Sequence, residues 1–159
     1  MKILLESKSI KETHDLADLL IKTIFYNKEF FQKYFKGKAI VVSLEGSLGS
    51  GKTEFLKGIA KSLKLKNKII SPTFIVMRKY DLNDCFFKSL WHLDCYRVFD
   101  KKSLTEIGLQ DIINDKNNII FIEWGNKIKK LLPKNSLRLK FKIIADDKRL
   151  IEIYFPFKL

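Results

Sequence analysis

The sequence predicts an α/β fold, in which one mixed sheet with added antiparallel strands carries helices on both faces. Three observations predict it. Short apolar runs rich in β-branched residues, at 38–44 and 118–123, have the composition of buried strands. A segment with apolar residues at helical spacing, 54–63, follows the first of these strands. Paired β-rich runs at 74–93 and 137–155, each interrupted by turn residues, indicate hairpins, so the sheet is not wholly parallel.

Length and composition predict a single globular domain over residues 1–159. The chain is 46% hydrophobic and 31% charged, which is typical of a soluble protein with a core of its own. No stretch approaches the roughly 20 apolar residues of a membrane span, and the N-terminus lacks the apolar region of a signal peptide. We therefore expect a cytoplasmic protein. Cys85 and Cys95 form no C-x-x-C pair, so we expect two reduced thiols and neither a disulfide framework nor a zinc site.

One glycine-rich octapeptide fits the pattern G-x-x-x-x-G-K-[ST] of a phosphate-binding loop, or P-loop. Its residues are Gly46, Ser47, Leu48, Gly49, Ser50, Gly51, Lys52 and Thr53. Glycines accept positive φ and carry no Cβ, so the backbone can wrap around phosphate oxygens with its N–H groups pointing inward. Lys52 would reach the β- and γ-phosphates, and the hydroxyl of Thr53 would bind Mg²⁺.

The flanking segments have the structure that a P-loop requires. A predicted strand, 38–44, precedes the loop, and a predicted helix, 54–63, follows it. The positive end of that helix dipole would lie beside the phosphates. A chance glycine-rich turn would need neither flank, so the sequence favours a nucleotide site.

Two acids at strand ends are candidates for the phosphate end of the site. The run 118–123 is apolar and ends in Glu123, as does a Walker B strand that delivers a carboxylate to Mg²⁺. Asp94 ends a second β-rich run, beside Tyr96 and Arg97. Asp94 and Arg97 can alternatively form a surface ion pair worth only about 0–1 kcal/mol. His92 by itself is more typical of a structural residue, and Trp124 either packs in the core or borders the site.

Three other segments allow a structural or a functional interpretation. In Ser71–Phe74, the proline disfavours helix at Ser71, and Thr73 either belongs to a plain loop or offers a hydroxyl near Mg²⁺ or the γ-phosphate. Ser9 and Glu12 form a capping box that starts a helix at Ile10, which we expect to pack on the sheet. The segment 102–113 is expected to be helical, with Gly108 as an interruption, and the C-terminal hairpin is expected to be a structural edge without chemistry.

The net charge of +13 is compatible with a polyanionic partner such as RNA. The lysines are scattered, however, and the joint richness in Lys, Ile, Asn and Phe fits an A/T-biased genome equally well. Neither an RNP-type aromatic motif nor a zinc knuckle accompanies the charge. Composition alone therefore leaves direct RNA contact open.

Five motifs in this order resemble the TsaE (YjeE) family, bacterial ATPases of the tRNA threonylcarbamoyladenosine pathway. They are residues 46–53, 71–74 (SPTF), 92–97 (HLDCYR), 106–109 (EIGL) and 122–124 (IEW). The likeness runs from the N-terminal helix through Pro133, and the second and third motifs are more specific than the P-loop. It implies a P-loop NTPase-like α/β sandwich that binds ATP with Mg²⁺ and hydrolyses it weakly alone.

The resemblance also implies partners. The protein would act with TsaD and TsaB, the pair that transfers threonylcarbamoyl to the adenosine next to the tRNA anticodon. ATP binding and hydrolysis would drive cycling of that complex rather than attachment of the group. Contact with tRNA could be indirect, through the complex, and neither a membrane nor DNA is expected as a partner.

Roles carry over from the family residue by residue. Lys52 and the loop amides would bind phosphates, and Thr53 and Glu123 would bind Mg²⁺. Asp94 would orient or activate the attacking water. The remaining correspondences are Thr73 as a switch-like residue, Trp124 as a neighbour of the site, and Ile10 with Thr13 as residues that line the base.

Two positions depart from the family pattern, in which Asp often replaces Ser47 and Thr often replaces Glu54. Neither supplies an indispensable phosphate donor, but the charge of Glu54 near the triphosphate could weaken nucleotide affinity. Two other functions remain open. A P-loop small-molecule kinase usually needs an arginine-bearing lid, and the four arginines of this chain form no evident cluster. A basic RNA-binding module with a vestigial nucleotide site would bind tRNA without hydrolysing ATP.

Overall fold

The computed structural model describes residues 1–66, 77–83, 86–97 and 101–156. The strands are β1 (Lys2–Ser7), β2 (Ile40–Glu45), β3 (Met77–Asp81), β4 (Ser89–Asp94), β5 (Asn118–Glu123), β6 (Leu137–Ala145) and β7 (Lys148–Tyr154). The helices are α1 (Ile10–Tyr26), α2 (Lys28–Tyr34), α3 (Lys52–Ser62), α4 (Lys101–Glu106), α5 (Leu109–Asn114) and the 3₁₀ segment η1 (Gly125–Leu131). The segment Ser71–Phe74, with Thr73, and Cys85 lie outside the described residues.

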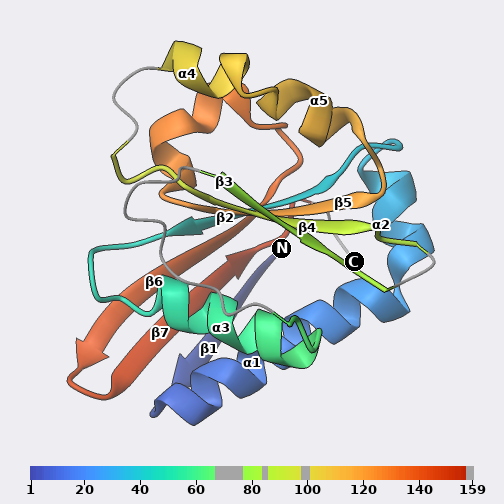
Figure 1. The fold of residues 1–159 in the computed structure, drawn as a ribbon. Helices are drawn as coiled ribbons and strands as arrows, with labels where there is room; N and C mark the ends of the chain where they lie inside the picture. Colours follow the sequence, from blue (N-terminus) through green and yellow to red (C-terminus); the bar gives the residue numbers. More distant parts are fainter. Residues whose placement is uncertain (67–76, 84–85, 98–100, 157–159) are drawn as a thin grey trace.

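The described strands form one mixed sheet in the order β1-β7-β6-β2-β5-β4-β3. The four central strands, from β6 to β4, run parallel, and β1, β7 and β3 are antiparallel to their neighbours. Figure 1 shows α1 and α3 on one face of the sheet, and α4 and α5 on the other. The predicted α/β sandwich with added antiparallel strands is confirmed.

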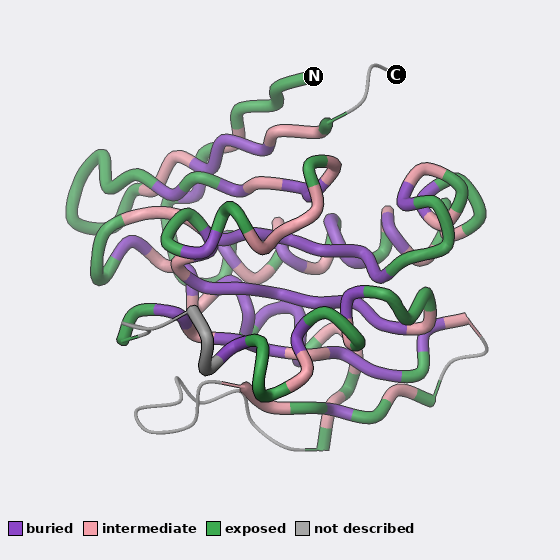
Figure 2. Tube along the Cα trace, turned by 90° about the horizontal axis from the view of Figure 1, so that it is seen from above, coloured by how far each residue is buried: buried purple, intermediate pink, exposed green. Residues whose placement is uncertain are grey.

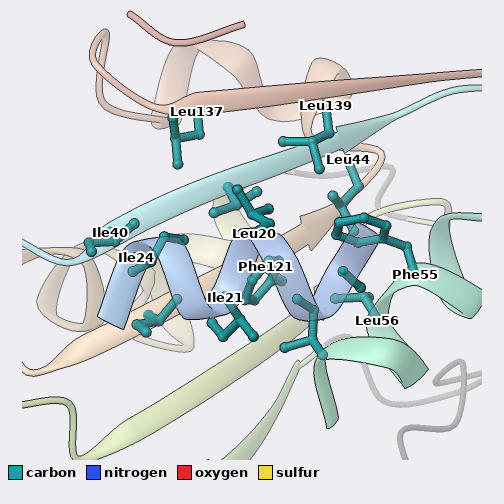
Figure 3. Packing of buried hydrophobic residues seen from close by; sticks show 14 of the residues in the cluster. Leu20, Ile21, Ile24, Ile40, Leu44, Phe55, Leu56, Phe121, Leu137 and Leu139 are labelled. Carbon is teal, nitrogen blue, oxygen red and sulfur yellow. The ribbon is translucent and has the colours of Figure 1, made fainter. Parts of the chain in front are cut away.

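The parallel centre is buried on both sides because helices cover both of its faces. Every residue of β5 is buried, as is all of β2 except Glu45. Figure 2 shows this buried layer through the middle of the molecule and exposed chain toward the N-terminus. Figure 3 shows part of the larger core cluster, where α1, α3 and β2 meet; the labelled residues include Leu20, Ile24, Ile40, Leu44, Phe55 and Leu56.

Helix α1 starts at the predicted capping box and packs closely on α3. The hydroxyl of Ser9 accepts a hydrogen bond from the Glu12 amide at 3.1 Å, and the Glu12 carboxylate accepts one from the Lys8 amide at 2.7 Å. The helices touch at Gly58, where an added Cβ would lie 2.8 Å from both the Ala17 Cβ and the His14 Cα. This approach aligns the two helices so that their N-termini lie at the same end.

Two expectations need correction, and one strand was not anticipated. The C-terminal hairpin is not the edge of the sheet, because β6 pairs with β2 and β1 occupies the edge beside β7. Strand β1 was not predicted, since its apolar residues are few and lack a clean alternation. The helix expected at 102–113 is two helices, and Gly108, with φ of 76°, stands between them. Along β6, buried residues alternate with less buried ones only from Leu137 to Phe141, and Ile143 is exposed.

Candidate nucleotide-binding site

The loop between β2 and α3 has the backbone that its glycines predict. Gly46, Gly49 and Gly51 all have positive φ, at 147°, 73° and 102°. Gly46 also has no room for a side chain, because an added Cβ would lie 2.6 Å from the Phe141 carbonyl oxygen on β6. Gly51 is the N-cap of α3, so the loop ends where the helix dipole begins.

Lys52 lies at the floor of the loop and is almost fully buried. Its ammonium donates hydrogen bonds to the carbonyl oxygens of Gly46 and Ser47 at 2.9 and 2.8 Å. The ammonium also sits 4.2 Å from the centre of the Trp124 ring. Burial lowers the pKa of Lys52, while the nearby carboxylates of Glu123 and Asp94 act in the opposite direction. A phosphate group would replace the carbonyl partners of this cation with anionic ones.

Glu123 reaches the first turn of α3 from the end of β5. The hydroxyl of Thr53 lies 2.9 and 3.2 Å from its two carboxylate oxygens. On the other side, Nε2 of His92 lies 3.1 Å from Glu123 Oε1, and both side chains are buried. Because a carboxylate only accepts hydrogen bonds, Nε2 must carry the proton in this contact. This hydrogen bond from His92 therefore helps to hold the Glu123 carboxylate in its orientation.

Asp94 ends β4 directly beside the end of β5. Asp94 and Glu123 are register partners on these parallel strands, so their side chains leave the sheet on the same face. The carboxylate of Asp94 accepts a hydrogen bond from the Tyr96 amide at 2.9 Å. This contact holds the acid at the strand end, next to the loop.

Two aromatic residues border this region. Trp124 follows β5 with φ of 60°, and its amide donates to the carbonyl oxygen of Leu44 on β2 at 2.9 Å. Such a conformation is uncommon for a bulky residue and is found most often at functional sites. Its ring lies 5.0 Å from that of Tyr96, and the ammonium of Lys127 sits near both rings. Trp124 thus packs against the core on the η1 side of the sheet and also lines the cavity beside the P-loop, and its role in a nucleotide site stays a prediction.

A cavity of about 290 Å³ joins these elements. The residues that line it are Leu48, Gly49, Ser50, Gly51, Lys52, Thr53, Glu54, Asp94, Tyr96, Glu123 and Trp124. Loop amides, a buried cation and two carboxylates thus face one space at the carboxyl ends of parallel strands, where α/β proteins bind their ligands. This arrangement of groups is suited to bind phosphate groups. Burial raises the pKa of the Cys95 thiol to about 12, which removes it as a nucleophile.

The two residues expected to line a base lie away from this cavity. Ile10 is exposed at the start of α1. Thr13 is buried, and its hydroxyl is engaged by the Ser7 hydroxyl at 2.5 Å and the Ser9 carbonyl oxygen at 3.1 Å. His14 nevertheless lies 3.3 Å from Glu54, so the N-terminus of α1 is beside the P-loop helix.

The negative charge of Glu54, near the expected position of the triphosphate, is paired with neighbouring side chains. Its carboxylate pairs with the Lys57 ammonium at 2.6 Å and with the His14 ring at 3.3 Å. These partners, Lys57 foremost, lower the pKa of Glu54 and neutralise its charge locally. The Glu54 carboxylate is therefore paired within the chain, and its effect on nucleotide affinity stays a prediction.

Sequence reasoning missed two contacts with the site. The hydrogen bond from His92 to Glu123 joins residues on different strands, so no local sequence pattern predicts it. The guanidinium of Arg149, on the C-terminal hairpin, lies 3.4 Å from the carbonyl oxygen of Gly49 and donates to three carbonyl oxygens of its own hairpin. The hairpin expected to be only structural thus braces the outer side of the P-loop.

The donor atoms fit Mg²⁺. This ion prefers oxygen ligands and is commonly held by one or two protein groups together with phosphates and water. Thr53 and Glu123 already bring a hydroxyl and a carboxylate into contact at the mouth of the loop. Among the described residues, no group of three or more His, Cys, Asp or Glu side chains is placed so that it could hold a metal ion.

Comparisons with known proteins agree with this geometry. Residues 7–151 match the family described as "Threonylcarbamoyl adenosine biosynthesis protein TsaE". The chain is 37% identical over 133 residues to the tRNA threonylcarbamoyladenosine biosynthesis protein TsaE of Borreliella burgdorferi, covering 83% of this chain and 92% of the relative. It is 34% identical over 146 residues to the protein of the same name from Rickettsia typhi, covering 91% and 90%.

A solved structure has the same architecture. The crystal structure of Bacillus subtilis YdiB superposes with a TM-score of 0.69 at 25% identity, covering 99% of this chain and 87% of that chain. Within the described residues, no helix is both long enough and apolar enough to span a bilayer. Fold, site and sequence lead to one conclusion: the chain belongs to the TsaE family of tRNA threonylcarbamoyladenosine biosynthesis proteins.

Proposed function

We propose that the chain is the ATP-binding and ATP-hydrolysing subunit of a cytoplasmic complex that makes N6-threonylcarbamoyladenosine next to the anticodon of tRNAs. Its partners in that complex are TsaB and TsaD, and the complex stimulates its weak hydrolysis of ATP. One observation carries the proposal: the P-loop, Lys52, the Thr53–Glu123 pair and Asp94 line one cavity.

The phosphates bind through the loop and the buried cation. Loop amides donate to the phosphate oxygens, and the Lys52 ammonium exchanges the carbonyl oxygens of Gly46 and Ser47 for the β- and γ-phosphates. Thr53 and Glu123 would hold Mg²⁺, and the ion would supply positive charge against the phosphates. The hydrogen bond from His92 keeps the Glu123 carboxylate aimed at this position.

Asp94 is the residue that orients or activates the attacking water. It lines the same cavity as Lys52, and its backbone neighbours that of Glu123 across the β4–β5 pair. Its hydrogen bond from the Tyr96 amide holds the carboxylate at the strand end. The rings of Trp124 and Tyr96 lie 5.0 Å apart, and both residues line the cavity. Thr73 is proposed as a switch-like hydroxyl. Ile10 and Thr13 lie outside the cavity, so in this proposal the base extends from it toward the N-terminus of α1, where His14 lies beside Glu54.

Reconstitution tests this function. The purified chain, TsaB, TsaD, threonylcarbamoyl-adenylate and unmodified tRNA are combined with or without Mg²⁺-ATP, and modified tRNA per complex is measured. We expect many turnovers with the wild-type chain and ATP, and roughly one without ATP or with Lys52→Ala. Multiple turnovers with Lys52→Ala would refute the proposal, and transfer of the γ-phosphate to a small molecule instead of water would indicate a kinase.

A further inference from the structure

One cation of the η1 segment lies beside the nucleotide site without lining its cavity. Lys127 is exposed, and its ammonium lies 5.0 Å from the centre of the Tyr96 ring and 5.7 Å from that of the Trp124 ring. The ammonium also donates a hydrogen bond to the carbonyl oxygen of Tyr96. None of the proposed steps of ATP binding and hydrolysis uses this residue.

The backbone of Lys127 is held firmly. Its amide donates to the carbonyl oxygen of Trp124 at 3.0 Å, and the Trp124 amide donates to the carbonyl oxygen of Leu44 on β2 at 2.9 Å. Gly125, which lies between them in the chain, packs directly on β2, because an added Cβ would lie 2.9 Å from the Cβ of Ser43. The side chain of Lys127 therefore projects from a rigid part of the fold, as a residue that positions others must.

The segment that Lys127 contacts lies at the end of the sheet. Strand β4 ends at Asp94, and the amide of Cys95 still donates to the carbonyl oxygen of Glu123 at 3.0 Å. Beyond Cys95 the chain leaves the sheet in a turn, and Tyr96 is 44% exposed. A turn lacks the ladder of hydrogen bonds that fixes a strand, so contacts with side chains contribute more to its position.

Tyr96 links Lys127 to the acid that we propose orients the attacking water. Its amide donates to Asp94 Oδ1 at 2.9 Å, and its carbonyl oxygen accepts from Lys127 Nζ. Both charged groups act on the adjacent Cys95 thiol: burial raises its pKa most, Asp94 raises it further, and Lys127 lowers it. The ammonium thus lies close to the end of β4, and a single residue, Tyr96, connects it to the Asp94 carboxylate.

We propose that Lys127 is a positioning residue for ATP hydrolysis: it holds the turn at Tyr96 so that the Asp94 carboxylate faces the phosphate end of the cavity. This role rests on the proposed function, in which Asp94 orients or activates the attacking water. Lys127 acts through Tyr96 and contacts neither the nucleotide nor the water. Because displacement of a reacting group by about 1 Å can cost on the order of 100-fold in rate, loss of this contact should be measurable in turnover.

Steady-state hydrolysis of Mg²⁺-ATP by the full chain with TsaB and TsaD tests the proposal. Lys127→Met keeps an unbranched apolar stem but cannot donate a hydrogen bond. It should lower kcat about tenfold, while KM for ATP stays within about twofold of the wild type. Lys127→Arg keeps a charged donor and should recover most of the loss. Lys130→Met removes the same charge from an exposed position of η1 and should hydrolyse ATP like the wild type.

A double-mutant cycle separates positioning of Asp94 from general support of the fold. If Lys127 acts through Asp94, Lys127→Met should slow the Asp94→Asn protein by less than about twofold, although it slows the wild type about tenfold. Independent effects of the two substitutions would multiply, and that result would overturn the proposal. So would a Lys127→Met protein with wild-type kcat, or one that binds ATP or TsaB–TsaD more weakly while kcat is unchanged.

The same measurements distinguish failure of this inference from failure of the proposed function. If the wild-type complex hydrolyses ATP and Asp94→Asn slows it, a Lys127→Met protein with the wild-type rate would overturn only the role of Lys127. A wild-type complex that releases no phosphate from Mg²⁺-ATP would refute the proposed ATPase, and the role of Lys127 with it.

Discussion

Replacement of His92 should weaken the Mg²⁺-dependent part of ATP binding without touching the phosphate-binding loop. His92→Leu keeps a bulky side chain in the buried position but removes the Nε2–H donor that lies 3.1 Å from Glu123 Oε1. The carboxylate then keeps Thr53 as a hydrogen-bond donor but loses the second donor, which helped to orient it. His92→Gln is the matched control, because its amide can place an N–H near the position of Nε2.

The expected magnitude follows from the hydrogen bond that the substitution removes. A hydrogen bond to a charged group contributes about 1.5–3 kcal/mol, and its removal from a buried carboxylate should lower the free energy of unfolding by about that amount. For a chain of this size each kcal/mol shifts Tm by about 2–4 °C, so His92→Leu should melt roughly 3–12 °C lower. Removal of a residue that orients a metal ligand typically costs about 10–100-fold in metal affinity.

The assay is a titration of a fluorescent ATP analogue, with Mg²⁺ and with EDTA. His92→Leu should bind about 10–100-fold more weakly with Mg²⁺ and like the wild type in EDTA. His92→Gln should recover most of the loss. A His92→Leu protein with wild-type Mg²⁺ dependence would refute the reasoning, and so would a His92→Gln protein that loses as much as His92→Leu.

Three further predictions concern other parts of the molecule. Asp94→Asn should bind ATP within about twofold of the wild type but hydrolyse it at least about 100-fold more slowly in the complex, because it lacks a base; normal phosphate release would exclude that role. Gly58→Ala puts a Cβ 2.8 Å from two atoms of α1. Even after the gain in helix propensity, it should lower the free energy of unfolding, measured in urea, by about 1–2 kcal/mol. Unchanged stability would contradict the close helix contact. Glu152 has its pKa lowered from 4.5 to about 2, so its pairing stabilises the fold above the higher value and is lost as pH falls toward the lower one. Glu152→Gln should therefore flatten the loss of stability between about pH 4.5 and 2, and an unaltered acid-unfolding profile would count against the pairing.

Local chemistry explains why much of the site was predictable. The P-loop is encoded within eight consecutive residues, because its function needs glycines and one cation at fixed spacing along the backbone. Glu123 was predictable for a similar reason, since a buried strand that ends in an acid is a local pattern. The hairpin of β3 and β4 followed from the turn residues between them, and its antiparallel pairing is confirmed.

The features that escaped prediction depend on contacts between distant segments. The pairing of β1 with β7 joins the two ends of the chain, and nothing in residues 2–7 specifies that partner. The contacts of His92 with Glu123 and of Arg149 with Gly49 arise only when the sheet order is known. The cavity lined by Lys2, Lys129, Lys134 and Arg138 draws these residues from β1, β6, η1 and the loop after η1, so its cations look scattered in the sequence.

A crystal structure with Mg²⁺ and a non-hydrolysable ATP analogue would test the central claim most directly. We predict that the β- and γ-phosphates lie within hydrogen-bond distance of the Lys52 ammonium, and that Mg²⁺ contacts the Thr53 hydroxyl beside Glu123. The Asp94 carboxylate should face the γ-phosphate across the same cavity. A triphosphate bound elsewhere on the protein would contradict the account.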